Sequence, residues 1–213
     1  MNTLILIFYK IAAFFTRVTS KSKHVHNELR AEKIAMVASS NPDSSLSVKN
    51  DHLYINQQAD LSHIPYGKTD MSFGGCGPIA LYNALLSLGK TKDLNDILNY
   101  LETNGIALGA KLGTSPYTLK KYLNNNGISA SVCRSKKDTK LNDFAKEYNT
   151  FITLIFNDTK SISKGLHFIC TVKNDDGTYT THNPLRTSDT LYDALSQCSS
   201  FKIRNLYTLG MNK

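Results

Sequence analysis

The feature that most constrains this sequence is a change in hydrophobic periodicity near Gly127. Before this glycine, apolar residues recur at the three-to-four-residue spacing of helices that bury one face. The predicted helices are 78–88, 93–103 and 116–126. After it, β-branched and aromatic residues cluster in short runs typical of strands. The predicted strands include 128–133, 151–156 and 201–209. The sequence therefore predicts an α+β protein with its helices first and an antiparallel sheet second.

A hairpin is the clearest local signal in the second half. Residues 166–184, "LHFICTVKNDDGTYTTHNP", contain two alternating runs around Asn174-Asp175-Asp176-Gly177. A glycine at the end of such a tetrapeptide supplies the positive φ that tight turns need. Two short helices, at 140–148 and 188–197, are predicted to flank the strands.

The chain is predicted to divide near residue 50. Residues 39–50, "SSNPDSSLSVKN", are rich in serine and turn-forming residues and are typical of a linker. We therefore expect a basic extension over residues 1–49 and one domain over residues 50–213. A chain of 213 residues with 41% hydrophobic content is long enough for one such core.

The extension holds an apolar segment, residues 4–15, "LILIFYKIAAFF". It is too short and too interrupted by charge to span a membrane, and it makes a poor secretory signal. Two interpretations stay open. Residues 4–23 could form an interfacial helix whose basic side chains meet lipid headgroups, or a helix that packs on its own domain. We expect a cytoplasmic protein, membrane-associated through this segment in the first case, with export as the alternative.

Composition limits the partners and cofactors. The net charge is +8, but no nucleic-acid motif accompanies it, so we expect no nucleic-acid partner. The cysteines are far apart, without a CxxC pair or a His/Cys cluster at metal-ligand spacing. They are Cys76, Cys133, Cys170 and Cys198. We therefore expect no disulfide framework, no metal and no cofactor. The oligomeric state is not indicated.

Cys76 is the candidate nucleophile. It lies between Gly75 and Gly77, with Pro78 next and an apolar helix following. A helix start stabilises a thiolate through free N–H groups and the helix dipole, and proline suits the first turn. Gly74, Gly75 and Gly77 are predicted to leave a side-chain-free approach for a substrate backbone.

A nucleophilic thiol needs a base, and the hairpin offers one. His167 and Asn183 lie almost symmetrically about the turn at 174–177, so strand pairing is expected to bring them side by side. The imidazole could then hydrogen-bond the side-chain amide, as in a nucleophile–base–orienter arrangement. His182 is predicted to point to the opposite face and is the less favoured base.

In order, these motifs resemble the papain-like cysteine peptidases of the C39 type. The matching segments are the helix-leading Cys-Gly-Pro, "GTSP", "GLHFICTV", "DDG" and "HNP", and the resemblance covers roughly residues 60–208. It implies a bacterial thiol peptidase with Cys76 as nucleophile, His167 as general base and Asn183 orienting the imidazole. It also implies a helical half packed against a twisted antiparallel sheet, and a peptide or protein substrate, such as a leader peptide cut after a double glycine.

The sequence departs from that family at one position. The family carries a glutamine six residues before the cysteine, whose amide helps to stabilise the oxyanion; Asp70 stands there in this chain. A carboxylate cannot donate a hydrogen bond, so a backbone N–H near Ser72 or Gly74 would have to substitute. Gln57 and Gln58 are farther away in sequence and are not expected to replace it. Three functions stay open: a peptidase, an acyltransferase on the same fold, and a catalytically silent peptide-binding module.

Overall fold

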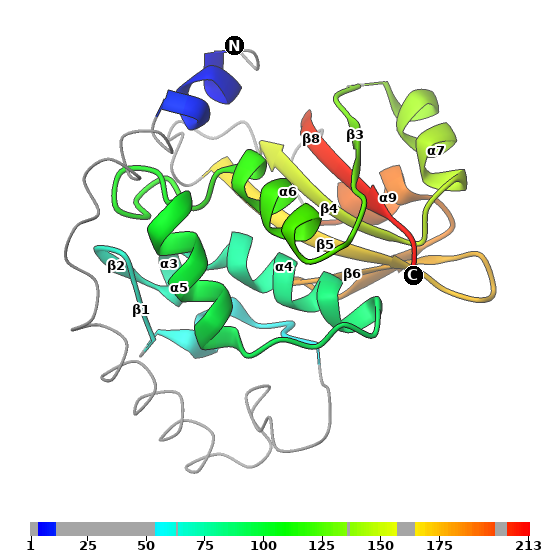
Figure 1. Cartoon of the computed structure of the whole chain (residues 1–213). Helices are drawn as coiled ribbons and strands as arrows, with labels where there is room; N and C mark the ends of the chain where they lie inside the picture. The colour runs from blue at the N-terminus through cyan, green and yellow to red at the C-terminus, as the bar shows by residue number, and fades with distance from the viewer. Residues whose placement is uncertain (1–3, 12–53, 63, 136, 157–164, 199–203) are drawn as a thin grey trace.

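The computed structural model of the chain confirms the predicted order of helices and strands (Figure 1). It describes residues 4–11, 54–62, 64–135, 137–156, 165–198 and 204–213. Helices of the first half pack against an antiparallel sheet formed by the second half, so the predicted α+β class and its arrangement of the two halves are confirmed. The predicted linker at 39–50 lies outside the described residues, and the division at residue 50 stays a prediction.

The helical half is organised around α4, the helix that Cys76 begins. Its elements are η1 (Gln58–Leu61), β1 (Pro65–Tyr66), β2 (Thr69–Asp70), α3 (Met71–Gly74), α4 (Cys76–Ser87), α5 (Leu94–Asn104) and α6 (Pro116–Asn125). Asp93 caps α5 by accepting from two backbone N–H groups of its first turn, and Pro116 opens α6, as expected of these residue types. The elements η1, β1, β2 and α3 were not predicted, because each is too short to carry a recognisable periodic pattern.

The second half forms one six-stranded antiparallel sheet in the order β3-β8-β4-β5-β6-β7. Its elements are β3 (Ser131–Cys133), α7 (Asp138–Lys146), β4 (Thr150–Phe156), β5 (Leu166–Lys173), β6 (Tyr179–His182), β7 (Arg186–Ser188), α9 (Leu191–Ser196) and β8 (Arg204–Met211). The central strand β4 lies between β5 and β8 and is buried along its whole length, which explains its mostly apolar and β-branched sequence.

The sheet separates two apolar cores. Ile152 and Leu154 of β4 belong to the core on the α4 side, whereas Phe151 and Ile155 belong to the core beneath α7 and α9. This alternation follows from the two-residue period of a strand. The larger core fixes α4 against β4 and β5, and so fixes where the first turn of α4 points (Figure 1).

The predicted hairpin joins β5 to β6. The Asn174 N–H donates to the Thr178 carbonyl at 2.8 Å, and Gly177 has a φ of +87°. The turn prediction is therefore confirmed. The ladder runs from Lys173↔Tyr179 to Cys170↔His182 and ends there, so His167 and Asn183 lie beyond its regular pairs.

The N-terminal helix, residues 4–11, packs on the domain. Ile5, Leu6 and Tyr9 are buried in the larger core. The opposite side of the helix is apolar but exposed. It consists of Leu4, Ile7, Phe8 and Ile11. In the part of the chain that the structure describes, no helix is long and apolar enough to cross a membrane; contact with a membrane surface stays a prediction.

Candidate active site

Cys76 lies at the first turn of α4, with its side chain almost covered. The residue is 7% exposed. Burial alone would raise the pKa of its thiol, but a hydrogen bond from His167 and the positive charge of that ring lower it. The backbone N–H groups of Phe168 and Gly77 act in the same direction, and the net result is a lowered pKa. Favourable donors around a sulfur at a helix start favour the thiolate.

His167 lies near the beginning of β5 and contacts both Cys76 and Asn183. Its Nε2 lies 2.8 Å from the backbone carbonyl oxygen of Asn183. A carbonyl only accepts, so Nε2 carries a proton and Nδ1 is the nitrogen left for the sulfur. Burial lowers the pKa of this imidazole, but the hydrogen bond to Cys76 and the thiolate charge, helped by the Asn183 carbonyl, raise it overall. The thiol and the ring therefore each favour the charged form of the other.

Asn183 orients the ring through its backbone, which corrects one expectation. The predicted partner of His167 was the side-chain amide, brought alongside by strand pairing. Instead, the chain leaves the ladder after His182, and Asn183 adopts a φ of +63° that turns its carbonyl toward His167. Asparagine tolerates this left-handed conformation better than most residues. Its side chain is thereby free to bind elsewhere.

Gln58 is the partner of that side chain. The Gln58 backbone N–H donates to Asn183 Oδ1 at 3.1 Å, and Asn183 Nδ2 donates to Gln58 Oε1 at 3.1 Å. Gln58 Nε2 also donates to the carbonyl of Ser72 in α3 at 2.9 Å. Gln58 therefore bridges the segment before the cysteine and the segment that holds the imidazole. Gln58 lies near the site despite its distance in sequence, because β1 and β2 turn the chain back. That it does not replace the family's glutamine stays a prediction.

The segment just before Gln58, residues 54–57, is held at two further points. Asn83 of α4 makes a reciprocal pair with Ile55, accepting from its N–H and donating to its carbonyl, each at 2.9 Å. His182 stacks on Tyr54 with ring centroids 3.8 Å apart, and its Nδ1 lies 2.9 Å from Asn56 Oδ1. Burial lowers the pKa of His182 to about 4. This histidine is thus a neutral anchor for the segment.

The glycines around Cys76 are explained by internal packing. A Cβ on Gly75 would lie 2.3 Å from the Met71 carbonyl oxygen, and one on Gly77 would lie 2.8 Å from the Thr114 side chain. A Cβ on Gly74 would meet the Ala110 carbonyl oxygen at 2.8 Å. The expected side-chain-free approach for a substrate is therefore corrected: this chain's own atoms fill the space next to each glycine.

Asp70 serves as a helix cap. Its Oδ1 accepts from the Phe73 backbone N–H at 3.1 Å and from the Ser72 hydroxyl, at the start of α3. Aspartate is a favoured residue at this position because its carboxylate satisfies an otherwise unpaired donor. Its charge is therefore directed to α3.

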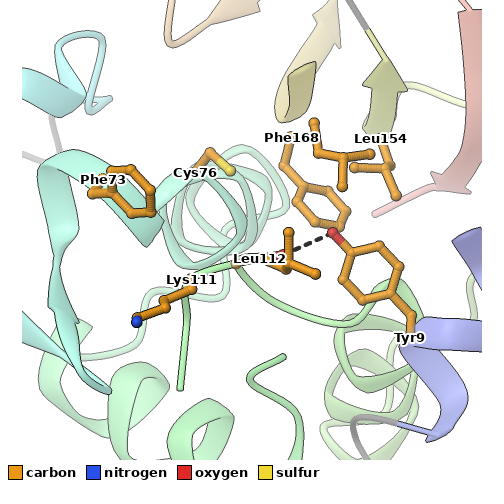
Figure 2. A pocket seen from close by; sticks show the side chains of 9 residues that line it. Tyr9, Phe73, Cys76, Lys111, Leu112, Leu154 and Phe168 are labelled. Carbon is orange, nitrogen blue, oxygen red and sulfur yellow. Dashed lines mark hydrogen bonds between the residues drawn. The ribbon is translucent and has the colours of Figure 1, made fainter. Parts of the chain in front are cut away.

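A small pocket adjoins Cys76 (Figure 2). It is lined by Tyr9, Phe73, Cys76, Lys111, Leu112, Gly113, Leu154, Leu166 and Phe168. Figure 2 shows Phe73 on one side of the cysteine and Tyr9, from the N-terminal helix, beyond Phe168 on the other. Across the described ranges, no group of three or more His, Cys, Asp or Glu residues is placed to hold a metal ion.

Comparison with known proteins finds likeness among solved structures. No protein-family model matches the sequence, and no curated protein matches it. The fold is similar to that of the peptidase domain of Streptococcus ComA, a bifunctional ABC transporter of a quorum-sensing pathway, with 15% sequence identity and a TM-score of 0.44. The match covers 64% of this chain and 91% of that domain.

Proposed function

We propose that the chain is a cysteine peptidase in which Cys76 attacks a peptide carbonyl and His167 transfers the protons. The contact between the Cys76 sulfur and the His167 ring carries this proposal, because it lowers the pKa of the thiol and raises that of the imidazole. Opposite shifts in a buried pair stabilise thiolate and imidazolium together, the ground state of an activated nucleophile.

The acylation half-reaction uses both charges. The thiolate of Cys76 adds to the carbonyl carbon, and the carbonyl electron pair moves onto oxygen. Backbone N–H groups at the start of α4 stabilise that oxyanion with the helix dipole. When the oxyanion collapses, the carbon–nitrogen bond breaks and the imidazolium Nδ1–H protonates the leaving amine. The products are a free amine and a thioester on Cys76.

Water resolves the thioester in the second half-reaction. Neutral His167 takes a proton from water through Nδ1, and the resulting hydroxide adds to the thioester carbonyl. The thiolate then leaves, the acid is released, and the imidazolium–thiolate pair is restored. Throughout, the Asn183 carbonyl accepts from Nε2, at 2.8 Å in the resting state, and holds the ring in the tautomer that presents Nδ1 to sulfur.

The most direct test uses p-nitrophenyl acetate as acyl donor. We expect nitrophenolate release, one acetyl group on the Cys76 peptide by mass spectrometry, and turnover beyond one equivalent. The matched control is Cys198→Ser, because that half-buried thiol lies away from the site and its pKa is raised, mainly by burial. Cys76→Ser should give no burst, whereas Cys198→Ser should behave as the parent. Absence of acylation in the parent chain and in every variant that opens the site would contradict the proposal.

Peptide hydrolysis and the substrate need separate probes. Synthetic peptides with and without a Gly-Gly pair, analysed by mass spectrometry, test the leader-peptide substrate that the family resemblance implies. Added amines test the acyltransferase alternative, since an amine that intercepts the thioester leaves an amide in place of an acid. A chain that binds such peptides but never acylates would be the silent binding module.

A further inference from the structure

The N-terminal helix is anchored beside the cysteine by a tyrosine. Tyr9 is 1% exposed, and its hydroxyl donates to the Leu112 carbonyl at 2.8 Å. Lys10, the next residue, places its ammonium 4.9 Å from the ring centroid of Tyr117 in α6, within the range of a cation–π contact. Together with buried Ile5 and Leu6, these contacts hold the helix at one position on the domain.

That position closes the space around the sulfur. Tyr9 forms one wall of the pocket that Cys76 also lines, with Leu112 and Phe168 between them (Figure 2). The cavity left with Tyr9 in place is about 10 Å³, enough for roughly one water molecule. Burial raises the pKa of the Tyr9 phenol, and the negative charge of Cys76 raises it further, so the hydroxyl stays a donor. A peptide side chain cannot enter beside the thiol while the phenol occupies this place.

We propose that the N-terminal helix is an internal ligand of this pocket, which blocks Cys76 until Tyr9 withdraws. The ligand class that competes with it is a peptide or small molecule carrying an aromatic ring, because the pocket walls are Leu112, Leu154 and Phe168 and the Leu112 carbonyl offers an acceptor. The blocking itself depends only on the geometry of Tyr9; its meaning for turnover rests on the function proposed above.

Covalent attachment makes the block effective and reversible. A helix of eight residues is not stable by itself in water, so its order depends on docking. Because the segment belongs to the same chain, its local concentration exceeds that of a free competitor. Cys76 then reacts only in the fraction of molecules whose helix has withdrawn, and any change that weakens docking raises that fraction.

The test compares full-length variants with a bulky thiol reagent. The fluorescein derivative of iodoacetamide is added to the parent, Tyr9→Ala, Tyr9→Phe and Phe8→Ala, and label on the Cys76 peptide is measured against time by mass spectrometry. Tyr9→Ala should accelerate labelling about tenfold or more. Tyr9→Phe, which keeps the ring but loses the Leu112 hydrogen bond, should accelerate it about fivefold. Phe8→Ala, a neighbour on the exposed side, should label like the parent.

Acetylation by p-nitrophenyl acetate, measured on the same variants, separates this inference from the proposed function. Faster labelling with faster acylation supports both. Faster labelling with no acylation in any variant supports the block and contradicts the peptidase. Unchanged labelling in both Tyr9 variants overturns the block, whatever the acylation shows. If circular dichroism shows that Tyr9→Ala is unfolded, Tyr9→Phe alone decides.

Discussion

His167 and His182, on adjacent strands of one hairpin, have pKa values that shift in opposite directions. Burial lowers the pKa of both rings. At His182 nothing opposes burial: the ring stacks on Tyr54 and the pKa falls to about 4. At His167 the sulfur of Cys76 and the carbonyl of Asn183 outweigh burial, and the pKa rises.

The comparison shows that the partner of a buried histidine decides its chemical role. A stacked, neutral ring is a structural group that holds residues 54–56 in place. A ring between an acid and a carbonyl acceptor is poised to give and take protons. Both kinds of site occur within one hairpin, so position on the strands does not by itself identify the base.

Removing the sulfur should have the largest effect. Cys76→Ser should reduce acylation by at least about a thousandfold, because serine at this site has no comparable anion. It should also lower the pKa of His167, since the negative charge that raises it is lost. Rates with p-nitrophenyl acetate and a histidine NMR titration measure the two effects. A pKa of His167 unchanged by the substitution would contradict the pairing.

Removing the ring should be the next largest effect. His167→Gln should raise the pKa of Cys76, because the hydrogen bond and positive charge that offset burial are lost. Alkylation by iodoacetamide should then be slower, by about tenfold or more near pH 6. The matched variant is His182→Phe, which keeps an aromatic ring for Tyr54. It should leave the pH dependence of alkylation in place; a shift as large as that of His167→Gln would remove the distinction between the two histidines.

Separating Gln58 from Asn183 should have a moderate effect on kcat. Asn183→Gly removes both hydrogen bonds to Gln58, whereas Gln58→Ala removes only the one from Asn183 Nδ2, because the backbone N–H of residue 58 remains. Both variants keep the carbonyl of residue 183, and glycine accepts the φ of +63°. Each should slow acylation about fivefold to tenfold, and the double variant should lose less than the product of the two single losses. The pH profile of acylation distinguishes a positioning role from a purely structural one, because only loss of positioning should shift it toward the profile of an ordinary thiol. Additive losses would mean that the residues act separately.

Protonation of His182 should have the smallest effect on catalysis. Its expected effect is on the free energy of unfolding. Its folded pKa is about 4 and its ordinary value is 6.5. The unfolded chain therefore binds the proton more readily, so stability is complete above about pH 6.5 and decreases as the pH falls toward 4. The loss at about pH 4 is about 2–3 kcal/mol. Urea unfolding at several pH values measures it, and His182→Phe should show a shallower decline; parallel declines would assign the effect to other groups.

The longer elements could be predicted from the sequence. The spacing of apolar residues and the length of each run identify α4, α5, α6 and β4. The hairpin turn was also predictable, since Gly177 needs a positive φ. A candidate nucleophile could be chosen because, of the four cysteines, Cys76 alone stands between glycines ahead of an apolar helix. These inferences rest on local chemistry, which sequence patterns report directly.

The orienting contacts could not be predicted, because they depend on where the chain leaves regular structure. Pairing along β5 and β6 ends before His167, and the carbonyl of Asn183 reaches the ring only through a left-handed residue. Gln58 reaches Asn183 because unpredicted short strands turn the chain back. One feature of the sequence could have directed attention to Gln58: it supplies an amide side chain upstream of Cys76, in a chain that has Asp70 where the family has glutamine. The sequence also could not show that Gly75 packs against Met71 and Gly77 against Thr114, in spaces too small for a Cβ.

The pH dependence of Cys76 alkylation, measured beside glutathione as an ordinary thiol, tests the thiolate–imidazolium pair most directly. The reagent is iodoacetamide, and label on the Cys76 peptide is followed in the parent chain and in His167→Gln. The midpoint for the parent should lie at lower pH than that of glutathione, and the midpoint for His167→Gln should lie at higher pH than that of the parent. A parent midpoint at or above that of glutathione, unmoved by the substitution, would contradict the thiolate–imidazolium pair.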